Sequence, residues 1–427
     1  MQLCSMHLQN FRCFTKIDVT FDPKLTVVVG FNGCGKTAVL EAAAIFLKHL
    51  HICQSCSKDM PITYMRIGST LTELDYTVQL DKKNYPISFK YQKALTSAID
   101  ADICKRNSCF LHALEKRVLP IIVYYSASRE IDKYQPERSN HVNSDAAYKN
   151  AFESCIDFSS TLTWFIEKSA EEALEAVHKK NLEHRIAELS AVRSAVSKAL
   201  GDYNEPYVAD TPPKLFITRR DAHDTPLSLE QLSDGYRTML ALVMDLARRM
   251  ALVSSTEKNI LETPGIVLID EIELHLHPAW QQTILPRLME IFPHVQFIVT
   301  TNSPQVLSSI LDKHIRILRT DGMVYSTHGT WGAETSRILK QVLGVDNRPP
   351  SQARDELEEY RTLVYNDTWD SERALELRKI LDARYADQEP ELTNLDMYIA
   401  NRKWEINGDE VCSSCAILCK QANQITK

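Results

Sequence analysis

The sequence predicts an α/β fold with a mixed sheet, flanking helices and an antiparallel β subdomain, together with a helical insertion and a helical C-terminal tail. Two observations lead to this prediction. Short apolar runs at 119–125, 265–269 and 295–301 are typical of strands buried within a sheet, and helical segments lie between them. Residues 71–91 instead alternate between apolar and polar on both sides of a polar turn at 81–84, which indicates an antiparallel hairpin.

The other elements follow from the same two periodicities. Residues 3–14 and 17–21 alternate like strands, and a turn is expected at 22–24. Apolar residues at helical spacing predict helices over 36–50, 145–200, 236–250, 279–291 and 335–405. Further hairpins are predicted at 214–229 and 315–325, and a loop at 130–144.

The composition is that of a globular protein: 427 residues, 44% hydrophobic and 25% charged. A net charge of −7 argues against a constitutively basic nucleic-acid binder, although it leaves a local basic patch open. The absence of an 18-residue apolar run or an export signal leads us to expect a cytoplasmic protein with no membrane contact. Eleven scattered cysteines, an odd number, agree with a reducing compartment.

The segment from Gly30 to Thr37 reads GFNGCGKT and lies between an apolar run and a helical run, the context of a P-loop. Glycines let backbone N–H groups wrap phosphates, and the helix N-terminus adds its dipole. Lys36 would attract the β- and γ-phosphates, and the Thr37 hydroxyl would bind Mg²⁺. The alternative is a chance glycine-rich turn. We expect these residues to bind ATP: Gly30, Asn32, Gly33, Cys34, Gly35, Lys36 and Thr37.

A second motif, GIVLIDEIELHLHP at 265–278, places Asp270 and Glu271 at the end of an apolar strand. Ligands bind at the carboxyl ends of strands in open α/β sheets. We therefore expect Asp270 to hold Mg²⁺, and Glu271 to act as the catalytic residue that orients or deprotonates the attacking water. An acidic turn without function is the alternative.

A third motif, LSDGYR at 232–237, opens a helix, and Ser233 and Gly235 make its start a further anion site. One nucleotide on a complete P-loop leaves no need for a second phosphate-binding helix in the same subunit. We therefore expect Ser233 and Gly235 to bind a nucleotide held by a partner subunit.

In this order and spacing, the three motifs resemble those of the ATP-binding-cassette (ABC) ATPases, which implies a head-to-tail dimer with two ATP molecules between the heads. NFRCF near the N-terminus, IDEIELHLHPAWQ and TTNSPQVL resemble the soluble branch that includes RecF, the SMC-like repair ATPases and the OLD ATPases. This resemblance makes Phe11 and Arg12 candidates for nucleotide contact; an ordinary pair of strand residues is the alternative.

More narrowly, IIVYYSASR, TWFIEKSAEE and PLSLEQLSDGYRTML resemble the PtuA family of Septu and retron anti-phage ATPases, over residues 1–345. The resemblance implies a regulatory or scaffold ATPase that oligomerises through ATP-sandwiched heads and controls an HNH nuclease similar to PtuB. A retron reverse transcriptase and its DNA, or another nucleic acid, are further candidate partners.

The sequence departs from that branch at Asn302, in TTNSP, where the branch has a histidine that contacts the γ-phosphate. Asn302 can donate a hydrogen bond but cannot take up a positive charge. We therefore assign Asn302 as a catalytic residue and predict ATPase activity that is weak or conditional.

Other signals leave alternatives open. Acidic residues after 345 lie on a charged helical stretch, without a second catalytic constellation, so a nuclease would be a separate chain. A RecF- or OLD-like DNA-binding repair ATPase without a nuclease partner is the alternative function, and a transporter cassette is disfavoured. The remaining candidates are interface packing or a metal at His275 and His277, a phosphate or surface contact at Arg129, and free thiols or a zinc site at Cys53, Cys56, Cys412, Cys415 and Cys419.

These assignments divide the chain into four parts. Residues 1–144 form the N-terminal half of the ATPase head with the P-loop, and residues 145–200 a helical insertion. Residues 201–334 form the C-terminal half with LSDG, the acidic strand end and the switch region around Asn302, and residues 335–427 a helical region that we expect to bind a partner.

Overall fold

A computed structural model describes residues 1–52, 62–92, 110, 120–128, 144–153, 156–220, 225–254, 259–319, 324–325, 327–386 and 388–406. The chain forms two compact units, Met1–Val345 and Asp346–Lys427. Helix α10 (Thr335–Gln341), which the sequence-based division put in the C-terminal region, lies in the first unit. Its Ile338 is buried in the main core of that unit, which explains the difference.

The central sheet of the first unit has six strands in the order β13-β12-β3-β11-β10-β6. The five from β12 to β6 run parallel, and β13 pairs antiparallel at the edge, which confirms the predicted mixed sheet. The strands are β3 (Leu25–Val29), β6 (Ile121–Tyr125), β10 (Gly265–Ile269), β11 (Val295–Thr300), β12 (Ile315–Leu318) and β13 (Val324–Tyr325). The predicted turn between the last two lies outside the described residues.

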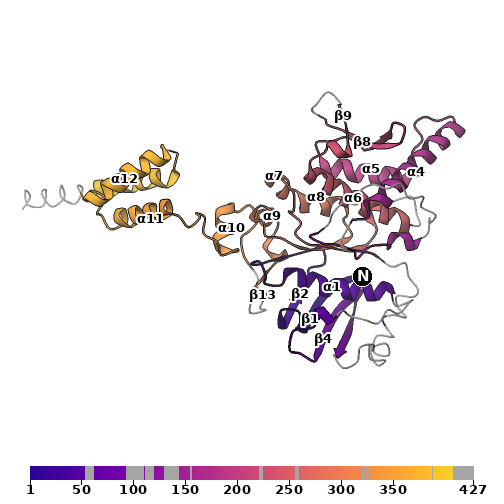
Figure 1. The fold of residues 1–427 in the computed structure, drawn as a ribbon, viewed down its shortest axis with the longest axis horizontal. Coiled ribbons are helices and arrows are strands. Elements are labelled where there is room, and N and C mark those ends of the chain that lie inside the picture. Colours follow the sequence, from indigo (N-terminus) through magenta and orange to yellow (C-terminus); the bar gives the residue numbers. More distant parts are fainter. Residues whose placement is uncertain are drawn as a thin grey trace, which may run out of the picture. The chain divides into compact units, whose positions relative to one another are not determined.

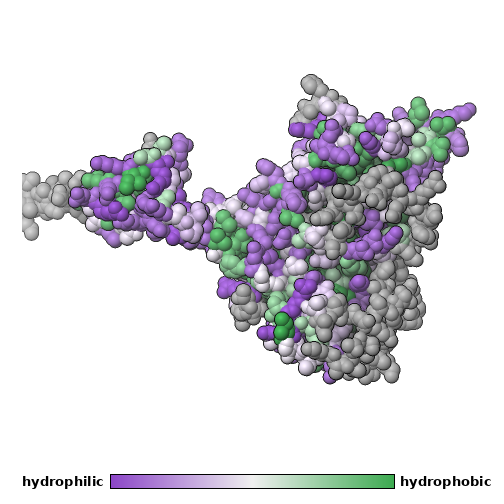
Figure 2. Space-filling view, viewed as in Figure 1, coloured by the Kyte–Doolittle hydropathy of each residue, from purple (hydrophilic) through white to green (hydrophobic). Residues whose placement is uncertain are grey.

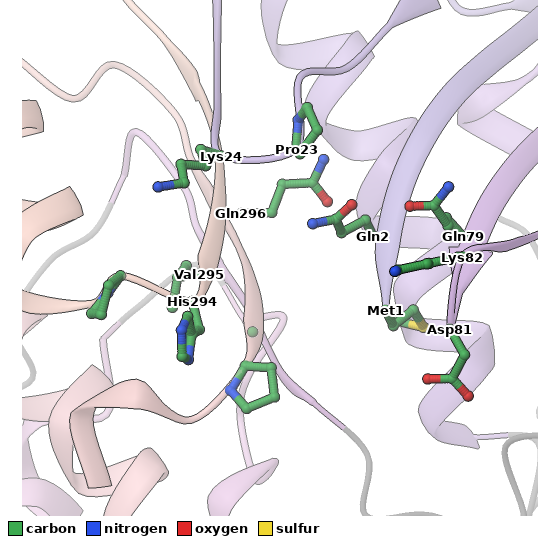
Figure 3. A pocket seen from close by; sticks show the side chains of 13 residues that line it. Met1, Gln2, Pro23, Lys24, Gln79, Asp81, Lys82, His294, Val295 and Gln296 are labelled. Atoms are coloured by element: carbon green, nitrogen blue, oxygen red, sulfur yellow. The ribbon is translucent and has the colours of Figure 1, made fainter. Parts of the chain in front are cut away.

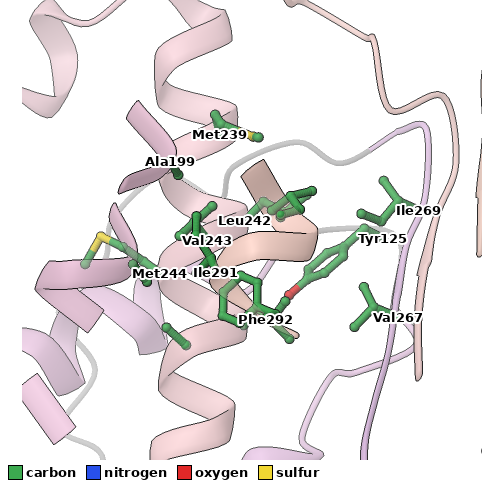
Figure 4. Packing of buried hydrophobic residues seen from close by; sticks show 14 of the residues in the cluster. Tyr125, Ala199, Met239, Leu242, Val243, Met244, Val267, Ile269, Ile291 and Phe292 are labelled. Carbon is green, nitrogen blue, oxygen red and sulfur yellow. The ribbon is translucent and has the colours of Figure 1, made fainter. Parts of the chain in front are cut away.

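Alternate residues of this sheet enter two different cores, because successive side chains of a strand point to opposite faces. Val267 and Ile269 pack with α6 on one face (Figure 4), whereas Ile266 and Leu268 pack with α1 and an antiparallel sheet on the other. The first face carries α5 (Ala187–Leu200), α6 (Asp234–Val253) and α8 (Ile284–Ile291), and the second carries α1 (Lys36–Ile52). Figure 1 shows α1 and α6 on opposite sides of the sheet. The helices thus leave the carboxyl ends of the strands as the place for a site.

The antiparallel sheet has the order β2-β1-β4-β5, with β1 (Gln2–Phe11), β2 (Phe14–Thr20), β4 (Leu71–Leu80) and β5 (Lys83–Gln92). The predicted hairpin at 71–91 is confirmed, with a turn of two residues that both have positive φ. The predicted strand 3–14 is interrupted, because Arg12 has a φ of +46° and turns the chain back on itself.

The helical insertion contains α4 (Phe158–His178) and α5, and most of the buried apolar residues of both belong to the main core. Leu174, Val177 and Leu182 are exposed near the end of α4, where Figure 2 shows apolar surface. The predicted hairpin at 214–229 is present as β8 (Lys214–Thr218) and β9 (Pro226–Ser228), and it gains an unpredicted third strand, β7 (Tyr207–Ala209).

The predicted helix 279–291 is two helices, α7 (Pro278–Gln281) and α8. Pro286 explains the break, because a proline ring clashes with the carbonyl four residues earlier, here that of Gln282. The short elements are α9 (Pro304–Ser308) and the 3₁₀ helices η1 (Ile62–Tyr64), η2 (Ser144–Ala147), η3 (Leu229–Gln231), η4 (Ile260–Glu262) and η5 (Asp312–His314).

The second unit is helical, as predicted, with α11 (Gln352–Tyr365), α12 (Glu372–Tyr385) and a helical run at 390–406. Leu357, Leu377 and Leu395 lie in its small core. Arg348 forms ion pairs with Glu389 and Glu391 in the same unit.

Candidate functional site

The predicted P-loop joins β3 to α1 at the carboxyl end of the central sheet. Lys36 is buried, and its Nζ donates hydrogen bonds to the carbonyl oxygens of Gly30, at 2.8 Å, and Phe31, at 3.2 Å. Gly33 and Gly35 have φ of +83° and +101°, a region that residues with a side chain rarely adopt. The loop is therefore curled around the Lys36 ammonium, and the first turn of α1 follows directly.

Thr37 and Asp270, from motifs far apart in the sequence, meet at the carboxyl ends of the strands. The Thr37 hydroxyl donates to Oδ2 of Asp270 at 2.8 Å, and Asp270 is 1% exposed at the end of β10. A hydroxyl and a carboxylate are oxygen ligands of the kind that Mg²⁺ takes in phosphate-binding sites. The residues present therefore fit a magnesium ion.

Thr300, which the sequence analysis missed, organises the acidic pair. Its hydroxyl donates to Oδ1 of Asp270 and accepts the backbone N–H of Glu271 at 2.8 Å. Glu271 has a φ of +48°, so this hydrogen bond holds a backbone conformation that is uncommon for a glutamate. The available sequence signal was that Thr300 ends a buried strand, at the edge where Asp270 also lies.

Asn302 lies beside the P-loop. Its side-chain Nδ2 is 3.4 Å from Oδ1 of Asn32, and its backbone N–H donates to Oε1 of Glu273 at 2.6 Å. The next residue, Ser303, caps α9 and donates to Oε1 of Gln281 at 2.6 Å. The structure thus brings Asn302 next to the nucleotide loop through contacts that the sequence did not reveal.

Arg12 lies at the turn between β1 and β2, close to the P-loop helix. Its guanidinium is 2.8 Å from Glu41 on α1 and stacks over the Tyr64 ring at 4.7 Å. Burial raises the pKa of Glu41, Arg12 opposes that shift, and the charge of Asp270 adds to it. The same turn packs on the P-loop, because a Cβ on Gly35 would lie 2.3 Å from the Phe14 ring.

The predicted signature residues occupy a different environment. Ser233 is the exposed N-cap of α6, and its hydroxyl makes no capping hydrogen bond. A Cβ on Gly235 would lie 2.5 Å from the carbonyl oxygen of His275, so the start of α6 packs closely on the loop after β10. Within the described ranges, side-chain hydrogen bonds link the P-loop to Asp270 and to Asn302. No side-chain hydrogen bond of Ser233 is seen there.

A buried ionic cluster supports the strand next to Asp270. The carbonyl of Tyr125 accepts the N–H of Asp270, and its hydroxyl donates to Asp245, which Arg249 also contacts at 2.7 Å. Burial alone would raise the pKa of Asp245, but Arg249 and Arg248 outweigh it and lower that pKa. The cluster ties β6 to α6 beneath the site.

Within the described residues, the remaining candidates form no second site. Nδ1 of His277 accepts the N–H of Ala279 and so caps α7, and burial raises the pKa of the Cys34 thiol despite nearby Lys36. In the part of the chain that the structure describes, no cluster of three or more His, Cys, Asp or Glu suits a metal, and no helix is long and apolar enough to cross a membrane. The candidates outside the described residues are Arg129, Cys53, Cys56, Cys412, Cys415 and Cys419.

A cavity of about 370 Å³ lies at the amino ends of the sheet strands, opposite the end that carries the P-loop (Figure 3). Lys24, Gly265 and Val295, at the amino ends of three strands, are among its lining residues. It is therefore separate from the P-loop, which follows a carboxyl end.

The strand order, the P-loop and the acidic strand end define an ABC-type P-loop ATPase fold. Two family models match the chain: one described as "AAA ATPase domain" over residues 1–116, and one described as "AAA domain, putative AbiEii toxin, Type IV TA system" over residues 110–308. These features and matches place the chain among the ATPases.

Curated relatives narrow this class. The "Retron Ec83 probable ATPase" of Escherichia coli is 28% identical, over 95% of this chain and 88% of the relative. The "Retron Vc95 probable ATPase" of Vibrio cholerae is 26% identical, over 74% of this chain and 73% of the relative. The "Septu protein PtuA" of Bacillus mycoides is 26% identical, over 73% of this chain and 40% of the relative. The chain is therefore similar to both the retron ATPases and the Septu PtuA proteins.

Among solved structures, an SMC head bound to the C-terminal winged-helix domain of ScpA matches with a TM-score of 0.48 and 16% identity, over 77% of this chain and 98% of that chain.

Proposed function

We propose that this chain is an ATPase of an anti-phage defence complex, which assembles through ATP held between two heads and controls an associated HNH nuclease. The observation that carries the assembly step is the split between two phosphate-binding elements. The P-loop has Lys36 and Thr37 at one edge of the sheet, whereas Ser233 is exposed on a separate helix start. A second copy would supply that helix start to the nucleotide. The similarity to retron and Septu ATPases supports the defence role.

Each residue has a separate role in this proposal. Lys36 and the backbone N–H groups of the loop bind the phosphates, and Thr37 and Asp270 hold Mg²⁺, which neutralises phosphate charge when bound. Glu271 orients or deprotonates the attacking water, while Thr300 keeps its backbone in place.

We further propose that turnover is weak or conditional, because Asn302 stands where the branch has a histidine. An amide 3.4 Å from Asn32 can donate a hydrogen bond at the P-loop, but it adds no positive charge in the transition state. Binding of a partner or of nucleic acid is the condition we expect to raise turnover.

The test is the native mass of the full chain expressed from its own operon, with Mg²⁺ and ATP, for the wild type and Glu271→Gln. We expect Glu271→Gln to bind ATP, to lose turnover and to accumulate in a larger assembly that contains nuclease chains. An assembly without a companion protein, binding DNA with an affinity that falls steeply with salt, would instead favour a RecF-like repair ATPase. A monomeric protein with ATP bound would contradict assembly through ATP held between two heads.

A further inference from the structure

The loop after β11 donates a hydrogen bond from Asn302, the residue whose side chain faces the P-loop. The backbone N–H of Asn302 donates to Oε1 of Glu273 at 2.6 Å. Glu273 belongs to the loop after β10, so the contact joins loops from two neighbouring strands. A hydrogen bond to a carboxylate is shorter and stronger than one between neutral groups. Glu273 therefore fixes the main chain at Asn302.

A second contact ties the loop after β11 to the segment that follows β10. The Ser303 hydroxyl donates to Oε1 of Gln281 at 2.6 Å, and Nε2 of Gln281 donates to the carbonyl of Leu276 at 2.8 Å. Two consecutive residues, Asn302 and Ser303, are thus attached to the segment that follows the acidic pair. The loop has little freedom to move away from the P-loop while both contacts persist.

The position of the main chain matters because an asparagine side chain is short. Its amide is already 3.4 Å from Asn32, near the limit of a hydrogen bond, so a small retreat of the loop would remove the contact. Misplacements of about 1 Å cost enzymes on the order of 100-fold in rate. The reach of Asn302 therefore depends on what holds its backbone.

We propose that Glu273 is a positioning residue for ATP hydrolysis, which holds the Asn302 backbone so that the Asn302 amide can act at the P-loop. This inference rests on the ATPase activity and on the role of Asn302 proposed above. In the described hydrogen bonds Glu273 contacts Asn302 and not the P-loop, so its effect passes through Asn302.

The test compares Glu273→Met, which removes the acceptor at similar size, with Glu273→Gln, which keeps an acceptor oxygen. Steady-state ATPase rates and the affinity for a fluorescent ATP analogue are measured on the full chain. We expect Glu273→Met to lower kcat about tenfold or more, with nucleotide affinity within about twofold, and Glu273→Gln to recover most of the rate. An unchanged kcat in Glu273→Met would overturn the proposal. If Glu273→Met does not fold, Gln281→Met removes the neighbouring anchor and should lower kcat in the same way; an unchanged rate there would count equally against it.

A double variant identifies the route of the effect. If Glu273 acts through Asn302, then Asn302→Ala and the pair Asn302→Ala with Glu273→Met should have the same kcat. Additive losses, or an Asn302→Ala variant with normal turnover, would show that Glu273 acts elsewhere and would overturn the inference. A wild-type chain that binds ATP but never hydrolyses it, alone or in its native complex, would contradict the proposed ATPase activity as well. Normal wild-type turnover with an unaffected Glu273→Met variant would contradict only this inference.

Discussion

The P-loop and the start of α6 are both phosphate-binding elements by sequence, yet their surroundings differ sharply. Lys36 is buried and hydrogen-bonded to its own loop, and Thr37 contacts Asp270. Ser233 is exposed at the end of its helix and its hydroxyl caps nothing. The P-loop is thus organised by contacts within one chain. The start of α6 leaves Ser233 exposed, as the proposed contact with a second copy requires.

The largest expected effect is the loss of ATP binding in Lys36→Ala. The variant removes a desolvated ammonium at the phosphate site, and hydrogen bonds to charged groups are worth about 1.5–3 kcal/mol, so we expect affinity to fall about 100-fold. Equilibrium titration with a fluorescent ATP analogue measures the change. Ser233→Ala is the matched control, and similar losses in both variants would erase the difference between the two elements.

In contrast to Lys36→Ala, Ser233→Arg should weaken assembly and leave ATP binding intact. Its bulk and charge lie on an exposed helix start, so the monomer should fold and bind ATP normally while ATP-dependent assembly weakens by about tenfold or more. Sedimentation of Glu271→Gln with and without Ser233→Arg, in Mg²⁺ and ATP, measures this. Undiminished assembly would mean that the start of α6 does not meet a partner.

A pair of glycine substitutions tests how tightly the P-loop is packed. Gly33→Ala meets no neighbouring atom, so it should cost only the strain of a positive φ, about 1–2 kcal/mol. Gly35→Ala adds a clash with the Phe14 ring and should cost about 1–3 kcal/mol more. The free energy of unfolding from denaturant titration gives both values. Equal losses of unfolding free energy in the two variants would show that the β1–β2 turn moves aside without a measurable cost.

The smallest effect should be on the stability of Ser233→Ala. Replacing a capping serine by alanine usually costs about 1 kcal/mol, but the Ser233 hydroxyl does not cap α6, so we expect a change below about 0.5 kcal/mol. Ser371→Ala is the control, since that side chain accepts the N–H of Ala374 at the start of α12. A Ser233→Ala variant as destabilised as the Ser371→Ala control would mean that the Ser233 hydroxyl supports the monomer.

The two elements also differ in how much the sequence revealed. The P-loop could be predicted because its chemistry is local: three glycines follow one strand, and Lys36 and Thr37 begin the next helix. Thr300, Glu273 and Gln281 could not, because their roles depend on partners brought together by the packing of β10 against β11. Arg12 was a candidate by resemblance, but its stacking on Tyr64 depends on a turn that the alternation pattern did not show.

By itself, the sequence determined the buried strands of the mixed sheet, most of the helices and the motif of the nucleotide loop. Hydrophobic periodicity and glycine placement act over a few residues and are therefore visible in the chain. Only the tertiary structure decided that Thr37 meets Asp270, that Asn302 reaches Asn32, and that Ser233 faces solvent. Those contacts depend on the order and register of strands far apart in sequence, and side-chain hydrogen bonds form only where that arrangement brings donor and acceptor within about 3 Å.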